Sequence, residues 1–346
     1  MDYRKQSRSI FIALLPVLFM SIYYYGLRAL LLCGFGAAVS VATDLLCRLL
    51  QRKSTREPYD LSAVNTGMML AMMLPASAPY WLVGAGAFLA IAIVRHPFGG
   101  TSATLFHPAN TAFAFLLICW TELVIRYPLP RQQLPLNSDT GVTLYSSPAA
   151  KLMTGGAERL DWLDILMGNF VGPMGCTCVL ILVCCGVFFA LRGTILWQIP
   201  AASLSVVALF AWLLPRVNSS SFSSVTLELI SGTMLFSIFF IASVDSGEIH
   251  TGLGKWICGF ILGGLIVLLR SLSRTEMVTP FAIIIMNTID HRCDAYGQNI
   301  IALLRRSFSL LGRACRWTGR AVVHFFSTLW ERFSDLLQKL VDSPRK

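Results

Sequence analysis

Long apolar runs separated by short polar or proline-containing breaks fill most of this chain. We count about ten runs of roughly 15–22 residues, long enough to cross a bilayer as helices. They lie near 9–26, 28–47, 61–76, 79–95, 108–125, 176–192, 196–215, 225–244, 253–271 and 277–290. Several are interrupted by Pro or Gly, which a membrane tolerates only where the freed backbone groups face protein or water. The pattern predicts an all-α polytopic membrane protein with broken helices.

The runs also carry an internal echo at two places far apart in the chain. Thr66-Gly67-Met68-Met69-Leu70 is echoed by Ser231-Gly232-Thr233-Met234-Leu235, and Pro108 by Pro280. At one common offset, Trp81, Gly84 and Arg95 are echoed by Trp256, Gly259 and Arg270. The echoed units begin five spans apart, and an odd offset inverts one unit relative to the other. The sequence therefore predicts two inverted five-helix repeats, with the functional site where they meet.

The composition excludes an ordinary soluble domain and makes nucleic acid an unsuitable partner. Hydrophobic residues make up 55% of the 346 residues and charged residues only 13%, against about 25% charged in soluble domains. Much of the net charge of +10 lies after residue 291, among Leu, Phe and Trp: Arg305, Arg306, Arg313, Arg316 and Arg320. The chain therefore divides into a transmembrane domain, 1–291, and a basic amphipathic tail, 292–346, suited to anionic lipid or a partner subunit.

Basic residues in the short loops predict the orientation of the chain. Arg4, Lys5 and Arg8 precede the first run, and four more basic residues follow the second, so both segments are expected in the cytoplasm: Arg48, Arg52, Lys53 and Arg56. The first run is too long for a signal-peptide core, so we expect it to be retained. An even span count then places both termini inside and the long loop 126–175 outside. The exceptions in this scheme are Arg216, Arg270 and Arg274.

Several polar residues within or beside the runs have two interpretations. The cysteines show no zinc spacing; Cys176, Cys178, Cys184 and Cys185 could hold a cluster but are favoured as small interface residues. Asp60 is favoured as a helix cap, whereas Asp245 and Glu248 could cap a helix, bind a cation or relay a proton. His107 and His250 are favoured as hinge or interface residues. Asn110 and Asn287 are expected to satisfy freed backbone groups, and Gly67 and Gly232 to permit close helix crossing.

Three segments resemble a known family. Asp60-Leu-Ser-Ala-Val-Asn-Thr-Gly67 with Leu74-Pro75 looks like the opening of its third span. Phe98-Gly99-Gly100 with Phe106-His107-Pro108-Ala109 looks like its GG…FNPA hinge, with His in place of Asn. Ser231-Gly232, Ala242-Ser243-Val244-Asp245 and Met286-Asn287 resemble its later spans. Over roughly residues 10–291 the chain resembles the D subunits of Rnf electron-transport complexes and, more distantly, the homologous B subunits of sodium-pumping NADH:quinone reductases.

The resemblance implies a covalent flavin on the long loop. In that family a threonine of an S-G-A-T motif carries FMN through a phosphoester bond, and the matching tetrapeptide here is Thr140-Gly141-Val142-Thr143. Thr143 is therefore the expected attachment residue, with Thr140 and Gly141 beside it. Taken alone, without the family resemblance, the tetrapeptide would be interpreted as a polar turn. It departs from the motif because Thr140 replaces Ser and Val142 replaces Ala, which puts efficient modification in doubt.

The resemblance further implies a bacterial inner-membrane subunit of an ion-translocating oxidoreductase complex. Electrons would pass through FMN between reduced ferredoxin and NAD, coupled to movement of Na⁺ or H⁺. The implied partners are the other membrane, iron–sulfur and flavin subunits of the complex, together with membrane lipid. No resident metal and no catalytic residue is expected on this chain. Two alternatives stay open: a small-solute transporter or channel on the same inverted-repeat plan, and a flavin-free scaffold subunit.

Overall fold

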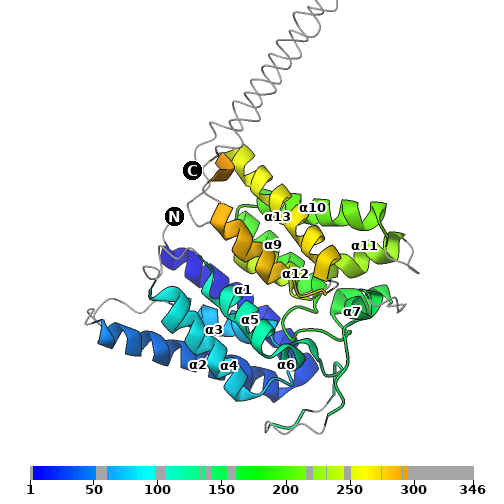
Figure 1. The fold of residues 1–346 in the computed structure, drawn as a ribbon. Helices are drawn as coiled ribbons and strands as arrows, with labels where there is room; N and C mark the ends of the chain where they lie inside the picture. Colours follow the sequence, from blue (N-terminus) through cyan, green and yellow to red (C-terminus); the bar gives the residue numbers. More distant parts are fainter. Residues whose placement is uncertain are drawn as a thin grey trace, which may run out of the picture.

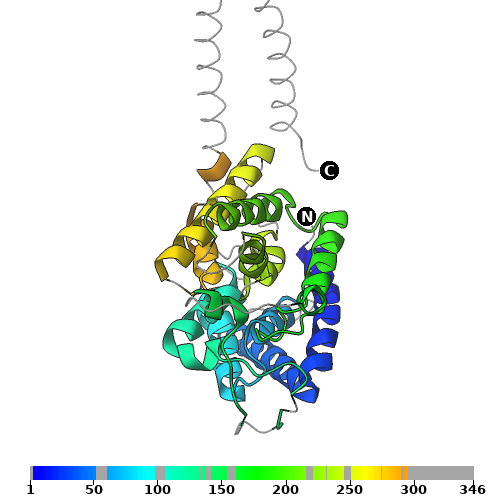
Figure 2. The same cartoon turned by 90° about the vertical axis from the view of Figure 1, so that its right-hand side faces the viewer.

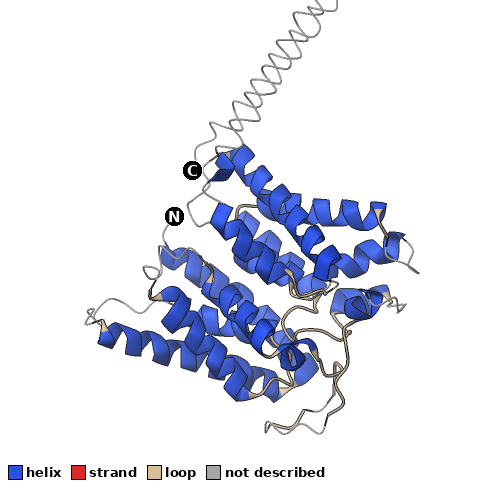
Figure 3. Cartoon of the chain, viewed as in Figure 1, coloured by secondary structure: helices blue, strands red, loops and turns tan. Residues whose placement is uncertain are grey.

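The regular elements of the computed structural model are all helices, joined by loops, in the parts of the chain that it describes (Figure 3). These parts are residues 3–51, 61–97, 106–132, 134–136, 142–153, 161–215, 221–230, 232–244, 251–273, 275–289 and 292–294. They contain no strand, only two isolated antiparallel bridges, which join Tyr127 to Tyr145 and Ile195 to Val244. The predicted all-α architecture is therefore confirmed. The predicted tail, 292–346, lies outside the described residues except for 292–294.

The helices form two groups that follow each other along the chain (Figure 1). The first group holds α1 (Tyr3–Tyr25), α2 (Leu27–Leu50), α3 (Ser62–Met73), α4 (Tyr80–Phe88), the π-helix η1 (Leu89–Arg95), α5 (Pro108–Cys119) and α6 (Thr121–Ile125). The second holds α9 (Val179–Leu191), α10 (Gln198–Leu213), α11 (Ser221–Ile230), α12 (Met234–Ser237), the π-helix η2 (Ile238–Ala242), α13 (Gly252–Ser273) and a last helix, Thr279–Ile289. The connection between the groups carries α7 (Pro148–Met153) and α8 (Trp162–Met167). The side view in Figure 2 shows the same division.

Three described helices are long and apolar enough to cross a membrane. They are Arg4–Tyr25, Leu27–Leu50 and Gly252–Ser273. A fourth span is possible by length if Ser223–Ile230 and Met234–Ala242 are taken together, although the two pieces are bent by 56°. Five further apolar helices are shorter. The described chain is thus built as a polytopic membrane protein with broken helices, while the plan of ten spans in two repeats stays a prediction.

Gly67 and Gly232 occupy matching positions in the sequence but have different structural roles. Gly67 lies inside α3 where this helix crosses α2, and an added Cβ would collide with the carbonyl oxygen of Gly36. The prediction that Gly67 permits a close crossing is confirmed. The same prediction for Gly232 is wrong: Gly232 has a φ of 57° and forms the turn that breaks α11 from α12. Glycine adopts this left-handed conformation without steric cost.

The two groups meet along α1, α9 and the starts of two short helices. The Cys185 thiol of α9 donates to the Ala13 carbonyl of α1 (3.3 Å), as expected of a small interface residue. Ser21 of α1 donates to the carbonyl of Met174 (2.9 Å). Asn110, in the first turn of α5, donates to the carbonyl of Pro280 (2.9 Å), so the starts of α5 and the last helix lie together. Asn110 therefore satisfies backbone, as predicted.

Candidate functional site

Thr143 stands on the surface of the connection between α6 and α9, which we call the connecting loop (126–175). Its side chain is exposed and its hydroxyl donates to the hydroxyl of Tyr145 (3.3 Å). Tyr145 in turn pairs with Tyr127 through two backbone hydrogen bonds, of 2.9 and 2.8 Å. The predicted attachment residue thus lies two positions from a fixed point of the loop. Thr140 and Gly141 lie outside the described residues.

Arg28 ties the connecting loop to the first group of helices. This arginine lies near the start of α2 and is fully buried. Its guanidinium donates to the carbonyl of Ala76 (2.7 Å), to that of Ala78 (3.2 Å) and to that of Pro135 on the loop. Tyr80, whose ring lies 5.7 Å from the Arg28 guanidinium, donates its hydroxyl to the carbonyl of Leu136 (2.8 Å). One buried cation therefore binds carbonyl groups from two segments, the turn before α4 and the connecting loop.

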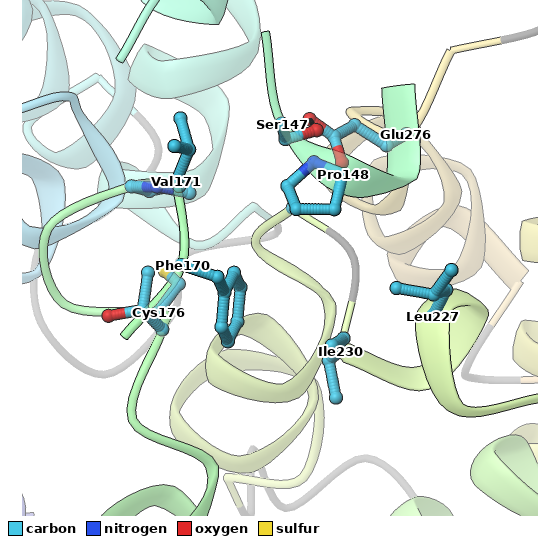
Figure 4. A pocket seen from close by; sticks show the side chains of 12 residues that line it. Ser147, Pro148, Phe170, Val171, Cys176, Leu227, Ile230 and Glu276 are labelled. Atoms are coloured by element: carbon cyan, nitrogen blue, oxygen red, sulfur yellow. Dashed lines mark hydrogen bonds between the residues drawn. The ribbon is translucent and has the colours of Figure 1, made fainter. Parts of the chain in front are cut away.

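Ser147 and Glu276 tie the same loop to the second group of helices. Ser147 precedes α7, and its hydroxyl donates to Oε1 of Glu276 (2.5 Å), which lies between α13 and the last helix. The Ser147 oxygen also accepts the backbone N–H of Ala150 (3.0 Å), which fixes the start of α7. Figure 4 shows the two side chains facing each other. The connecting loop is therefore braced against both halves of the molecule.

A small cavity opens beside this contact. It is partly enclosed, has room for little more than a water molecule, and is lined by Ser147, Phe170, Cys176, Thr177, Leu227 and Glu276 among others. Most of the wall is apolar. Burial raises the pKa of Glu276, and the nearby carboxylate of Glu228 raises it further. The hydrogen bond from Ser147, the charge of Arg270 and the backbone N–H of Gly232 lower it. Burial also raises the pKa of Tyr127, whose ring lies near Glu276.

A buried ion pair lies behind the cavity. Nη1 of Arg270 donates to Oε2 and to the backbone carbonyl of Glu228, both at 2.7 Å. The two side chains expose only 2% and 9% of their areas. Arg270 is thus a charge inside the protein and not a loop charge, which explains why it departs from the predicted orientation rule.

The other residues singled out in the sequence are distributed over the molecule. His107 directly precedes α5, and its carbonyl accepts from Thr111, while its role as a hinge or interface residue stays a prediction. Asn287 is half-buried in the last helix. No group of three or more His, Cys, Asp or Glu that could hold a metal occurs within the described ranges. Asp60, Asp245, Glu248 and His250 lie outside them.

Sequence reasoning missed Arg28, Ser147, Glu228 and Glu276. For Arg28, Glu228 and Glu276 a signal was present, since an ionisable residue inside or beside an apolar run is expected to be paired and functional. For Ser147 there was none, because a serine in a polar loop is common. The helices and the braced loop together define a multi-span helical membrane protein with a polar connection held between its two halves.

Comparison with known proteins identifies the family. The family described as NQR2, RnfD, RnfE matches residues 1–301, so this chain belongs to it. The resemblance predicted from the sequence is therefore confirmed. The D subunit of the ion-translocating oxidoreductase complex of Haemophilus ducreyi is 28% identical over 84% of this chain and 91% of its own length.

Two further relatives differ in the ion that their names give. The D subunit of the Na⁺-translocating ferredoxin:NAD⁺ oxidoreductase complex of Acetobacterium woodii is 31% identical over 81% of this chain and 84% of its own. The D subunit of the proton-translocating ferredoxin:NAD⁺ oxidoreductase complex of Clostridium ljungdahlii is 24% identical over 84% and 89%. The relatives are thus subunits of multi-subunit, ion-translocating electron-transport complexes.

Proposed function

We propose that this chain is a membrane subunit of an Rnf-type complex that passes electrons through FMN bound covalently to Thr143. The observation that carries the proposal is the exposed Thr143 hydroxyl on a loop braced at Arg28 and at Glu276. A phosphoester requires an accessible hydroxyl, and electron transfer requires that the carrier be held at a defined place. When bound, FMN would supply the redox chemistry, and the protein would set its position.

The residues around Thr143 fit an attached phosphate. Thr143, Leu144 and Tyr145 are all exposed, so the hydroxyl is open to a modifying enzyme. The new bond would join Thr143 Oγ1 to phosphorus, and the hydroxyl proton would leave with the group displaced from the flavin donor. The neighbouring Tyr145 hydroxyl, 3.3 Å from Thr143 Oγ1, would remain to orient that oxygen or the ester.

We further propose that the chain forms two inverted repeats in the bacterial inner membrane, with both termini in the cytoplasm. Equivalent packing supports the repeats: Gly84 packs against Phe35 of α2, and its echo Gly259 packs against Ile199 and Ala202 of α10. In this orientation the connecting loop is extracytoplasmic. The partners would be the other subunits of the complex, and the transported ion Na⁺ or H⁺.

Flavin fluorescence tests the central claim. The full chain, co-expressed with a flavin transferase, should fluoresce under ultraviolet light in a denaturing gel. Thr143→Ala should abolish the fluorescence, because no hydroxyl remains to form the ester. Thr140→Ala is the matched control and should only reduce it, and Val142→Ala should increase it if the larger side chain slows modification.

Two results would count against the proposal. Fluorescence that survives Thr143→Ala would place the flavin on another residue. A wild-type chain that never fluoresces, although the transferase modifies a second substrate in the same cells, would favour the scaffold or transporter function.

A further inference from the structure

The charges behind the connecting loop do not balance. Glu228, Arg270 and Glu276 expose 7%, 2% and 4% of their surfaces. Arg270 is 2.7 Å from a carboxylate oxygen of Glu228, and both Arg270 and Glu228 lie near enough to Glu276 to act on its charge. If both carboxyl groups were ionised, this buried cluster would carry one excess negative charge. Such a charge is strongly disfavoured in a low-dielectric interior unless a cation neutralises it.

The two carboxyl oxygens of Glu276 have different hydrogen-bonding environments. Oε1 accepts the Ser147 hydroxyl at 2.5 Å. Oε2 is buried and has no hydrogen-bond partner among the described residues. The backbone N–H of Gly232 acts on the carboxyl group from nearby but forms no hydrogen bond of good geometry with Oε2. Because a carboxylate oxygen is an acceptor only, an ionised Oε2 would lose its hydration for little compensation, whereas a neutral carboxyl group needs no counter-charge.

A cavity and additional buried polar atoms surround the carboxyl group of Glu276. The cavity that Glu276 lines with Ser147 and Thr177 is only partly enclosed, so a proton can reach the carboxyl group through it. The hydroxyl groups of Tyr127, on the connecting loop, and Tyr25, at the end of α1, are also buried without partners in the described chain. Tyr127 lies near both Glu276 and Tyr25. Buried polar atoms from three segments thus converge where the two halves and the loop meet.

We propose that Glu276 is a proton-binding site, whose carboxyl group takes up one proton from solvent through this cavity while Ser147 holds its other oxygen. Uptake forms one O–H bond on Oε2 and removes the excess charge of the cluster; release reverses both. The step involves no electron transfer. The groups that face Glu276 are Ser147 and Tyr127 from the connecting loop, Glu228 from α11 and Arg270 from α13, and Cys176 lines the same cavity.

This site is independent of the flavin, and the experiment can be made on flavin-free protein. We would record infrared spectra of the purified full-length Thr143→Ala chain in lipid nanodiscs, across a pH titration. A neutral carboxyl group has a carbonyl stretch that an ionised one lacks. We expect such a band near neutral pH, shifted in D₂O and lost on alkalisation. Glu276→Gln should remove it, and Glu276→Asp should retain it with a different midpoint.

Matched variants separate the site from general effects. Glu122→Gln on α6 alters an exposed carboxylate and should leave the band and its midpoint unchanged, since the Glu122 side chain is 76% exposed. Ser147→Ala should raise the midpoint, because the lost hydrogen bond stabilised the ionised form. Circular dichroism would show whether Glu276→Gln folds. If it does not, the shifted midpoint of Ser147→Ala still tests the site.

Two outcomes would overturn the proposal. The first is a spectrum that Glu276→Gln leaves unchanged in a folded chain. The second is a band that disappears on addition of NaCl at constant pH, but not of choline chloride, which would make Glu276 a Na⁺ ligand. Neither outcome bears on whether Thr143 carries FMN.

Discussion

Two buried arginines at echoed positions, Arg95 in the first half and Arg270 in the second, have different surroundings. Each exposes 2% of its surface. Arg270 is paired with Glu228, whereas the two terminal nitrogens of Arg95 have no hydrogen-bond partner among the described residues. Glu228 lies four residues before Gly232, and the residue four before Gly67 is Ala63. The matching positions thus share the cation and not its carboxylate, so the interiors of the two helix groups differ here.

The largest effect is expected from breaking the ion pair of the second half. Glu228→Ala leaves Arg270 buried without its carboxylate and should lower the free energy of unfolding by about 3–5 kcal/mol. Arg95→Met is the matched change in the first half and should cause no comparable loss, because it removes a cation that has no carboxylate partner. Denaturant unfolding in mixed micelles, followed by circular dichroism, measures both.

The double variant Glu228→Leu with Arg270→Met sharpens this comparison. Replacing a buried pair by apolar side chains is often neutral, so the double variant should be clearly more stable than Glu228→Ala. Equal losses for Glu228→Ala and Arg95→Met would show that the two arginines are held alike.

The next-largest effects on stability are expected at the two glycines in matching positions, Gly67 and Gly232. Gly67→Ala places a methyl group against the backbone of Gly36, which cannot move aside without separating α2 from α3. We expect a loss of about 1–3 kcal/mol, as for other overpacked interiors. Gly232→Ala places a methyl group about as close as 3.1 Å to the Met277 sulfur and 3.2 Å to the Glu276 carbonyl oxygen. The alanine must also take a left-handed conformation, at a cost of roughly 1–2 kcal/mol.

Thermal unfolding in detergent compares these two variants, with Gly264→Ala as control, since nothing lies within 4 Å of a Cβ at Gly264. A Gly67→Ala chain as stable as the control would mean that the α2–α3 crossing is looser than described.

The smallest effect concerns pH. Burial raises the pKa of Glu276 above its ordinary value, so between the two values the folded chain binds more protons than the unfolded chain. Stability from this group is therefore present at lower pH and is lost as the pH rises through the folded-state pKa. The melting temperature of the wild type should fall with rising pH relative to that of Glu276→Gln. Parallel profiles would contradict this.

The apolar runs predicted the long helices well and their interruptions poorly. The runs 28–47 and 253–271 correspond closely to α2 and α13. The run 225–244 does not form one helix, because Gly232 turns the chain between α11 and α12. The run 79–95 forms a helix whose second part is the π-helix η1. The apolar pattern predicts which residues are removed from water. It does not predict where the backbone hydrogen bonding changes from an α-helix to a turn or a π-helix.

Only the exposed part of the candidate site could be proposed from the sequence, and the role of Thr143 stays a prediction. Thr143 could be chosen because a motif of adjacent residues marks it. Ser147 and Glu276 are 129 positions apart, and Arg28 contacts Pro135 from 107 positions away. Arg28 binds backbone carbonyls, which every residue possesses, so the residue types around it contain no sign of the contact.

The braced loop also limits how far a group attached to Thr143 could travel. Tyr145 is fixed by its ladder to Tyr127, and two fully extended residues span at most about 7 Å. The position of Thr143 is therefore confined to within this distance of Tyr145. A carrier attached there could not shuttle between distant partners. The electron donor and the electron acceptor would each have to approach the small region that the carrier can occupy.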